Sequence, residues 1–100
     1  PVQVVMVSIA DRHADRCVEV AGLLRARGVR AEVDRESAKT SIKIAGAEAR
    51  KVPYMAVVGD RELESGTLSV RARGRRDLGS LSVEGFADRL TAEIESRTEV

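Results

Sequence analysis

Hydrophobic positions recur along the chain with spacings that distinguish strands from helices. Residues 2–9 and 52–58 are apolar at nearly every position, as expected of central strands covered on both faces. Residues 29–33 and 67–73 alternate apolar and polar side chains, which predicts strands with one exposed face. Residues 78–81 follow a glycine-containing turn and are expected to form a short edge strand.

Three further segments carry apolar residues at helical spacing. The first begins at Asp11 or Asp15, either of which can cap a helix, and ends before Gly28. The second spans residues 38–50, and the third follows Ser82, which is placed to cap it. The side chains expected to face the sheet are Cys17, Val20, Ala21 and Leu24 in the first helix, Ile42, Ala45 and Ala49 in the second, and Val83, Phe86, Leu90 and Ile94 in the third.

The order of these elements predicts an α/β fold: a three-layer α/β/α sandwich with a mixed five-stranded sheet and three main helices. The first three strands are expected to be parallel and joined by right-handed crossovers. Only about eight residues separate the third and fourth strands, whereas a parallel return usually needs a dozen or more. The fourth strand is therefore expected to be antiparallel.

Composition narrows the class of protein. One hundred residues with 43% hydrophobic content fit a single domain, residues 1–100, that can fold without disulfides or a metal. Cys17 is the only cysteine, which excludes an internal disulfide and favours a reducing, cytoplasmic location. No apolar run approaches the roughly 18 residues of a membrane span. The start at Pro1 indicates a fragment of a longer protein or a processed start.

The charge distribution leaves two interpretations open. The net charge is only +1, from 17 basic and 16 acidic residues, so the domain as a whole is not a polycation. Its densest basic cluster is RARGRR, residues 71–76, which is either a solvated surface or a phosphate-facing one. Aromatic side chains are limited to Tyr54 and Phe86, which argues against a base-stacking platform.

The residues that could support catalysis have simpler explanations. His13 is the only histidine and stands at a helix start, where an exposed or capping role is favoured. Cys17 lies on the apolar side of its helix and is expected in the core. The loop after the first strand, IADRHAD, has no glycine, which argues against a nucleotide-binding or flavodoxin-like site. No metal cluster and no catalytic site are expected.

Glu62 and Arg71 are the remaining candidates for recognition. Glu62 either pairs with Arg61 or Arg71 in an ordinary surface salt bridge, worth about 0–1 kcal/mol, or meets Arg71 at one end of the sheet to form a pair that binds a nucleobase. A carboxylate accepts bonds from the N1–H and amino groups of guanine, and an arginine donates to carbonyl and ring-nitrogen acceptors. Such recognition needs unpaired bases, which in RNA are found in loops.

Three strings carry a family resemblance over essentially the whole chain: PVQVVMVSIAD, LLRARGVRAEVD and KVPYMAVVGDRELESGTLSVRARGRRDLGSL. They resemble the C-terminal anticodon-binding domain of bacterial-type threonyl-tRNA synthetases, which are class II aminoacyl-tRNA synthetases. The resemblance implies a five-stranded mixed sheet flanked by three helices. It also implies binding to the anticodon loop of threonine tRNA, in which Glu62 and Arg71 help to read the bases. The second and third letters of threonine anticodons are always G and U.

One segment departs from the family pattern. Synthetases of this family usually carry D-x-R-N-E-K-I-x-x-K-I-R after the second strand, where this chain has DRESAKTSIKIA. Ser37 replaces the asparagine, and Glu36 and Ala45 replace two arginines, which implies weakened or rearranged anticodon contacts. The resemblance implies that Ser37 still contributes to base reading. It assigns phosphate contacts to Lys39, Lys43, Lys51 and Arg73, for which solvated surface charges are the alternative.

The resemblance also separates this domain from the enzyme around it. The parent would be a threonine–tRNA ligase whose catalytic domain uses ATP, threonine, Mg²⁺ and zinc and forms a homodimer. This segment is expected to be non-catalytic and to need no cofactor, with tRNA rather than DNA or a membrane as its partner. The alternative is a stand-alone or paralogous module that has lost strong tRNA reading and binds protein or RNA.

Overall fold

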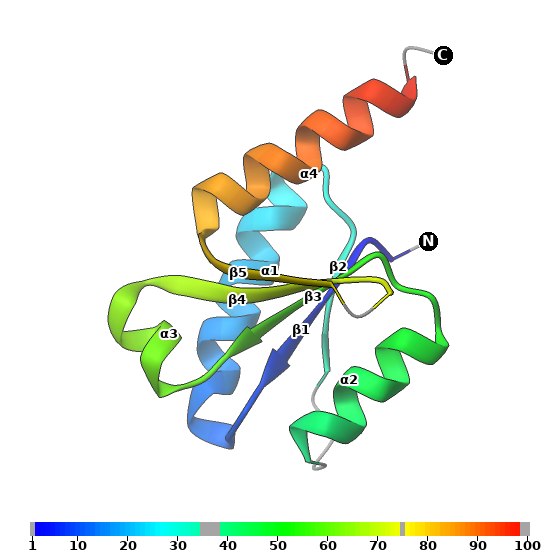
Figure 1. Ribbon diagram of the computed structural model, residues 1–100. Coiled ribbons are helices and arrows are strands. Elements are labelled where there is room, and N and C mark those ends of the chain that lie inside the picture. Colours follow the sequence, from blue (N-terminus) through cyan, green and yellow to red (C-terminus); the bar gives the residue numbers. More distant parts are fainter. Residues whose placement is uncertain (1, 35–38, 75, 99–100) are drawn as a thin grey trace.

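The computed structural model describes residues 2–34, 39–74 and 76–98, which form a mixed five-stranded sheet with helices on both faces (Figure 1). β1 pairs in parallel with β2 and β3, β4 is antiparallel to β3, and β5 is antiparallel to β4. The predicted sandwich with an antiparallel fourth strand is therefore confirmed. In spatial order the strands are β2 (Ala31–Asp34), β1 (Val4–Ser8), β3 (Tyr54–Val58), β4 (Thr67–Ala72) and β5 (Arg76–Ser82).

The helices form the outer layers of the sandwich. One face of the sheet is covered by α1 (Ala14–Ala26), which follows the 3-10 turn η1 (Asp11–His13), and by α4 (Val83–Thr98) (Figure 1). The other face is covered by α2 (Thr40–Ala49). The six-residue helix α3 (Asp60–Ser65) connects β3 to β4 and is additional to the three predicted helices. The hydrophobic pattern did not predict this helix, because residues 60–65 carry a single apolar side chain, Leu63, and none of them is buried.

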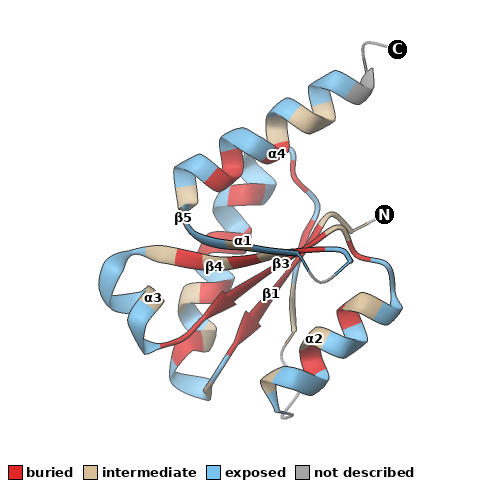
Figure 2. Cartoon of the chain, viewed as in Figure 1, coloured by how far each residue is buried: buried red, intermediate tan, exposed pale blue. Residues whose placement is uncertain are grey.

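The larger core lies between the sheet and the pair α1 and α4, where the red segments of Figure 2 gather. The predicted faces of both helices are confirmed. Buried side chains come from α1, from α4 and from the facing positions of β1, β3 and β4. They include Cys17, Val20, Ala21 and Leu24 of α1 and Phe86 and Leu90 of α4, with Val83 and Ile94 packed against them.

The predicted sheet-facing side of α2 is wrong. Ile42 is 59% exposed, and Ala45 and Ala49 are also exposed, whereas Lys43 and Ala47 are buried. Lys43 can occupy this position because its aliphatic stem covers apolar surface while its ammonium lies 3.5 Å from the Ser8 carbonyl oxygen. The cluster beneath α2 is small: Val5, Val7, Met55 and Val57 of the sheet, with Ala47 and Val52.

Helix ends follow the predictions in part. The backbone N–H of His13 donates to the carbonyl of Ala10, and α1 has no side-chain cap, so neither predicted aspartate cap is present. Gly28 ends the α1 region with φ of 83°, a left-handed conformation that favours glycine. Ser82 caps α4 as predicted, because its Oγ accepts the Gly85 N–H at 3.0 Å.

β4 alternates as predicted and leaves one polar face open. Leu68, Val70 and Ala72 are buried in the larger core, so Thr67, Ser69 and Arg71 point to the side of α2 and are half-buried. Among the described residues, neither β4 nor β5 contributes to the cluster beneath α2. The edge strand β5 is longer than residues 78–81 and continues this polar face.

Candidate nucleic-acid interface

Glu62 lies in the first turn of α3 and is partly used by its own helix. Gly59 precedes the helix, and its N–H donates to Glu62 Oε1 at 2.8 Å. This is the reach-back contact of a capping box, which orients the carboxylate at the start of a helix. Gly66 ends α3 with φ of 73°. Glu62 is half-buried, and among the described residues its Oε2 has no hydrogen-bond partner.

Arg71 lies on the open polar face of β4, far from the start of α3. It pairs with Met55 on β3, whereas Glu62 follows the other end of β3, beyond Val58. Met55 and Val58 are three residues apart, which corresponds to about 10 Å along a strand. The expectation that Glu62 and Arg71 meet at one end of the sheet is therefore wrong. The base-reading roles of the two residues stay predictions.

The open face offers polar groups around Arg71. Within the described part of the chain, its guanidinium has no ion-pair or hydrogen-bond partner. Ser69 precedes it on the same face, and Ser80 stands directly opposite Ser69 on β5. Asp77 stands directly opposite Arg71 on β5, where its Oδ1 accepts the Gly79 N–H, and among the described residues it forms no ion pair with Arg71. Arg71 can therefore donate to bases or phosphates without first breaking an ion pair.

Asp60, the first residue of α3, holds a cluster that the sequence did not indicate. Arg12 donates to both of its carboxylate oxygens, from Nε to Oδ1 at 2.9 Å and from NH2 to Oδ2 at 2.7 Å. His13 Nε2 lies 2.6 Å from Asp60 Oδ1. The hydrogen bonds from Arg12 and then from His13 hold the pKa of Asp60 well below its usual range, and the Asp60 carboxylate raises the pKa of Arg12.

His13 was predicted to be exposed or to cap a helix start. The exposure is wrong, because its ring is 1% exposed, whereas the capping role is confirmed, because its ring accepts the N–H of Ala10 before η1. Its Nδ1 accepts the Ala10 N–H at 3.0 Å, so the proton of the neutral ring lies on Nε2 and is donated to Asp60. No short-range pattern could have found this contact, because Asp60 is 47 residues away in sequence.

The lysines predicted to contact phosphate differ in exposure. Lys39 precedes α2 and is exposed, whereas Lys43 is only 8% exposed. Lys43 is therefore not a solvated surface charge. Lys51 is exposed and follows α2 with φ of 60°, a left-handed conformation that is costly for a residue with a Cβ. Its phosphate role and those of the other lysines stay predictions.

The last predicted phosphate ligand, Arg73, lies at the amino end of β3. Its N–H donates to the Pro53 carbonyl at 2.8 Å, and its side chain is exposed. It lines a cavity of about 310 Å³ together with Pro53, Tyr54, Arg76 and Glu93. At this cavity the Tyr54 hydroxyl donates to Glu93 Oε1 at 2.5 Å, and burial, followed by this contact, raises the pKa of Tyr54.

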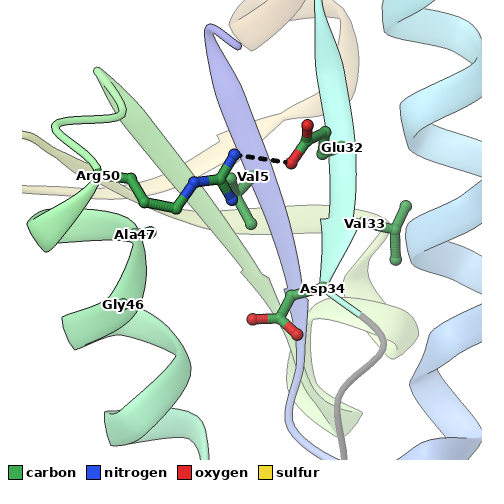
Figure 3. A pocket seen from close by; sticks show the side chains of 7 residues that line it. All are labelled: Val5, Glu32, Val33, Asp34, Gly46, Ala47 and Arg50. Atoms are coloured by element: carbon green, nitrogen blue, oxygen red, sulfur yellow. Dashed lines mark hydrogen bonds and ion pairs between the residues drawn. The ribbon is translucent and has the colours of Figure 1, made fainter.

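A second hollow, of about 340 Å³, lies between α2 and β2 (Figure 3). Arg50 reaches from the end of α2 to Glu32 on β2, and their charged groups are 3.1 Å apart. Gly46 and Ala47 have little or no side chain, which leaves space between the helix and the edge strand. Ser37, the third predicted base-reading residue, and Glu36 lie outside the described residues.

Other kinds of site have little support. Within residues 2–34, 39–74 and 76–98, no group of three or more His, Cys, Asp or Glu side chains is placed to hold a metal ion. No helix in the same ranges is both long enough and apolar enough to cross a membrane. Cys17 is fully buried, which raises the pKa of its thiol to about 11 and disfavours the reactive thiolate.

The sequence and the fold are similar to those of known proteins. The family model described as an anticodon binding domain matches residues 2–93. A threonine–tRNA ligase from Desulforamulus reducens is 40% identical over 98 residues. The match covers 98% of this chain and 15% of that ligase, so the chain spans less than a fifth of the length of this relative.

Solved structures share the fold at low sequence identity. The RNA-binding domain of threonyl-tRNA synthetase from Cryptosporidium parvum matches with a TM-score of 0.79 and 23% identity, over 96% of this chain and 23% of that one. Histidyl-tRNA synthetase from Nostoc sp. PCC 7120 matches with a TM-score of 0.85 and 17% identity, over 94% and 23% of the two chains. The arrangement of strands and helices is thus shared by domains of more than one synthetase.

Proposed function

The chain belongs to the family of anticodon binding domains, and on that premise we propose that it binds the anticodon loop of threonine tRNA and reads its G and U. The observation that carries the proposal is the open polar face of β4 and β5, on which Arg71 has no partner within the described residues. The similarity to a threonine–tRNA ligase supports threonine tRNA as the substrate.

Glu62 is the proposed reader of the guanine. Its Oε1 already accepts the Gly59 N–H, which fixes the orientation of the carboxylate before RNA arrives. A carboxylate has about four acceptor positions, so Oε2 and the remaining position on Oε1 can accept the N1–H and amino donors of guanine. Adenine presents an acceptor at N1 instead, so this arrangement discriminates against it.

Arg71 is the proposed donor to a second base. Because Glu62 and Arg71 stand at different levels along the sheet, they contact different nucleotides of the loop rather than one base together. Uracil presents two carbonyl acceptors, which a guanidinium can bind. The separation of Glu62 from Arg71 along the sheet does not allow both to bind one base, but it is compatible with the reading of two adjacent anticodon letters.

The remaining contacts are made to the RNA backbone. Lys39, Lys51 and Arg73 are exposed and are proposed to bind phosphates, with Ser37 contributing to base reading. Lys43 is proposed to donate to a phosphate at the carboxyl end of β1, because its ammonium has three donors and, among the described residues, makes one contact of 3.5 Å, to the Ser8 carbonyl. Lys51 adopts a left-handed conformation in which glycine would be less strained, which supports a role for its side chain.

The protein that carries this domain is proposed to be a cytoplasmic threonine–tRNA ligase, dimeric through its catalytic domain, with ATP, Mg²⁺ and zinc used there. A module with weakened tRNA reading is the second candidate. It is favoured by Ala45, which is exposed on α2 where the family pattern has an arginine. The binding experiment below separates the two candidates.

The test measures the dissociation constant for an RNA stem-loop that carries a threonine anticodon, by fluorescence anisotropy at fixed salt. Arg71→Ala is expected to weaken binding by about 1–3 kcal/mol, or roughly 5- to 150-fold. Glu62→Gln is expected to reduce the preference for G over A at the second anticodon letter. Arg30→Ala, an exposed arginine just before β2, is the matched control and should bind as wild type does. Equal binding by wild type and all variants would favour the interaction module.

A further inference from the structure

We propose that Arg12 and His13 are positioning residues for anticodon recognition, because they hold Asp60 and thereby fix α3 and the carboxylate of Glu62. The inference rests on the proposed function of Glu62 and adds residues from the first βα connection to it. Arg12 and His13 are not proposed to touch the RNA. We call the three residues Arg12, His13 and Asp60 the α3 clamp.

α3 needs such a clamp because packing does not hold it. None of its six residues is buried, and its one large apolar side chain, Leu63, is 45% exposed. At its two ends, the Leu63 N–H donates to the Gly59 carbonyl and the Gly66 N–H donates to the Glu62 carbonyl. The helix is only six residues long, which is less than two turns. Helices this short are marginal in water without tertiary contacts.

The clamp joins α3 to a rigid part of the fold. Arg12 grips both oxygens of Asp60 in a bidentate arrangement, and His13 adds a third hydrogen bond. The His13 ring is 1% exposed, and its Nδ1 is fixed by the Ala10 N–H, so its donor cannot rotate away from Asp60. The turn η1 that carries both residues leads directly into α1, whose inner side is buried in the larger core.

The position of Asp60 is transmitted to Glu62 within one helical turn. Asp60 and Glu62 are the first and third residues of α3, and the Glu62 carboxylate is bound to the backbone of Gly59. Gly59 itself is closely covered: a Cβ built on it would lie 2.5 Å from Ile9 Cδ1 and 3.2 Å from Glu62 Oε1. Releasing Asp60 therefore loosens the same turn that orients Glu62.

The clamp is placed to act locally rather than on global stability. The side chains of Arg12 and Asp60 are 65% and 68% exposed, and exposed ion pairs contribute little to the free energy of unfolding. Loss of the clamp is therefore expected to change the opening of α3 and the base preference, while the rest of the chain stays folded.

The first experiment measures amide hydrogen exchange of Leu63 and Gly66 by NMR. Asp60→Asn and Arg12→Gln are expected to accelerate exchange at these amides about three- to tenfold relative to amides of β1 and β3. Asp88→Asn is the matched control, since it removes an ion pair of the same length, 2.7 Å to Arg27, that joins α4 to α1. Both main variants alter exposed side chains, which avoids the folding risk of replacing buried His13. Unchanged exchange in α3 would overturn the proposal.

The second experiment measures the preference of the same variants for stem-loops with G or A at the second anticodon letter. Asp60→Asn is expected to lower this preference about threefold in wild type and not at all in a Glu62→Gln background, because it acts through Glu62. If Glu62→Gln lowers the preference and Asp60→Asn does not, the inference fails while the proposed function stands. If amide exchange in α3 accelerates but neither Asp60→Asn nor Glu62→Gln alters the preference for G over A, then the proposed roles of the clamp and of Glu62 in base recognition are both overturned.

Discussion

α3 leads into β4 and α4 follows β5, yet these two helices are held in place by different forces. α4 buries Phe86, Ala87 and Leu90 in the larger core and is capped by Ser82. No residue of α3 is fully buried, and hydrogen bonds from Arg12 and His13 hold its first residue, Asp60. The larger core thus holds α4 in place, whereas α3 depends mainly on polar contacts.

α2 is intermediate between these extremes. It buries Ala47 and the stem of Lys43 against a small cluster, and it leaves Ile42 exposed. A helix held in this way contributes less to stability than α4 and is freer to vary on its exposed side. If this comparison is right, substitutions should separate into those that change unfolding and those that change RNA binding.

The largest expected effect is that of Phe86→Ala on stability. Phe86 is fully buried and packs edge-on against Tyr54, with ring centroids 5.8 Å apart, so truncation leaves a cavity and should cost about 3–5 kcal/mol. Urea denaturation measures the loss. Leu63→Ala in α3 is the control and should change the free energy of unfolding by less than about 0.5 kcal/mol. Similar losses for both variants would contradict the contrast between the two helices.

Tyr54→Phe should have a smaller effect on stability. The variant keeps the buried ring and removes the hydroxyl that donates to Glu93, so α4 loses one polar contact with β3 at a cost of about 1 kcal/mol. The same denaturation experiment reports this loss, and RNA base preference should stay as in wild type. A stability equal to that of wild type would show that apolar packing alone holds α4 at this point.

Lys43→Met tests how α2 is held and whether Lys43 binds phosphate. Methionine retains an apolar side chain of similar length and removes the ammonium near Ser8, so the free energy of unfolding should change by less than about 1 kcal/mol. If Lys43 donates to a phosphate, the slope of log K against log salt should flatten by about 1 in the variant. Lys51→Met serves as the exposed comparison. An unchanged slope for Lys43→Met would make Lys43 a structural residue only.

The smallest expected effect is that of Asp60→Asn on how folding stability decreases at acid pH. The folded state lowers the pKa of Asp60, mainly through the hydrogen bonds from Arg12 and then His13, relative to about 3.9 in an unfolded chain. The carboxylate therefore stabilises the fold above about pH 4, and this contribution is lost as the pH falls through the folded-state pKa. Urea midpoints measured from neutral to acid pH should fall less in Asp60→Asn than in wild type. Superimposable curves would contradict the contact.

The sequence predicted the parts of the fold that follow from local patterns. Period-two alternation placed Leu68, Val70 and Ala72 on the core side of β4, and the resulting open face carries Arg71. The short connection after β3 required an antiparallel fourth strand, which the structure confirms. These features depend on residues close together in the chain, which is why they could be inferred.

The features that the sequence did not predict depend on distant partners. The capping role of His13 was predicted, but its burial and its contact with Asp60 were not, because Asp60 is 47 residues away. α2 was assigned the wrong inner side because Lys43, a charged residue, is buried through its stem at the end of β1. α3 has no apolar stripe, but acidic residues in its first turn and Gly66 after its end are signals that could have indicated it.

The separation of Glu62 from Arg71 is the most instructive of these differences. Both residues flank the same connection, and their proximity in sequence suggested a pair. β4 is antiparallel to β3 and carries the chain back along it. Arg71, nine residues after Glu62, therefore stands beside Met55, near the amino end of β3, whereas Glu62 follows its carboxyl end. The sequence pointed to both residues as candidates, and the register places them at different levels along the sheet.

Cys17 gives the chain a native reporter of its own opening. Its thiol is fully buried beneath α1, and burial raises its pKa to about 11, so little thiolate is present at neutral pH and none of the side chain is accessible. A thiol-reactive dye can therefore label the chain only when α1 leaves the sheet. Because Cys17 is the only cysteine, the rate of labelling measures how often the larger core opens, and no cysteine has to be introduced for the experiment.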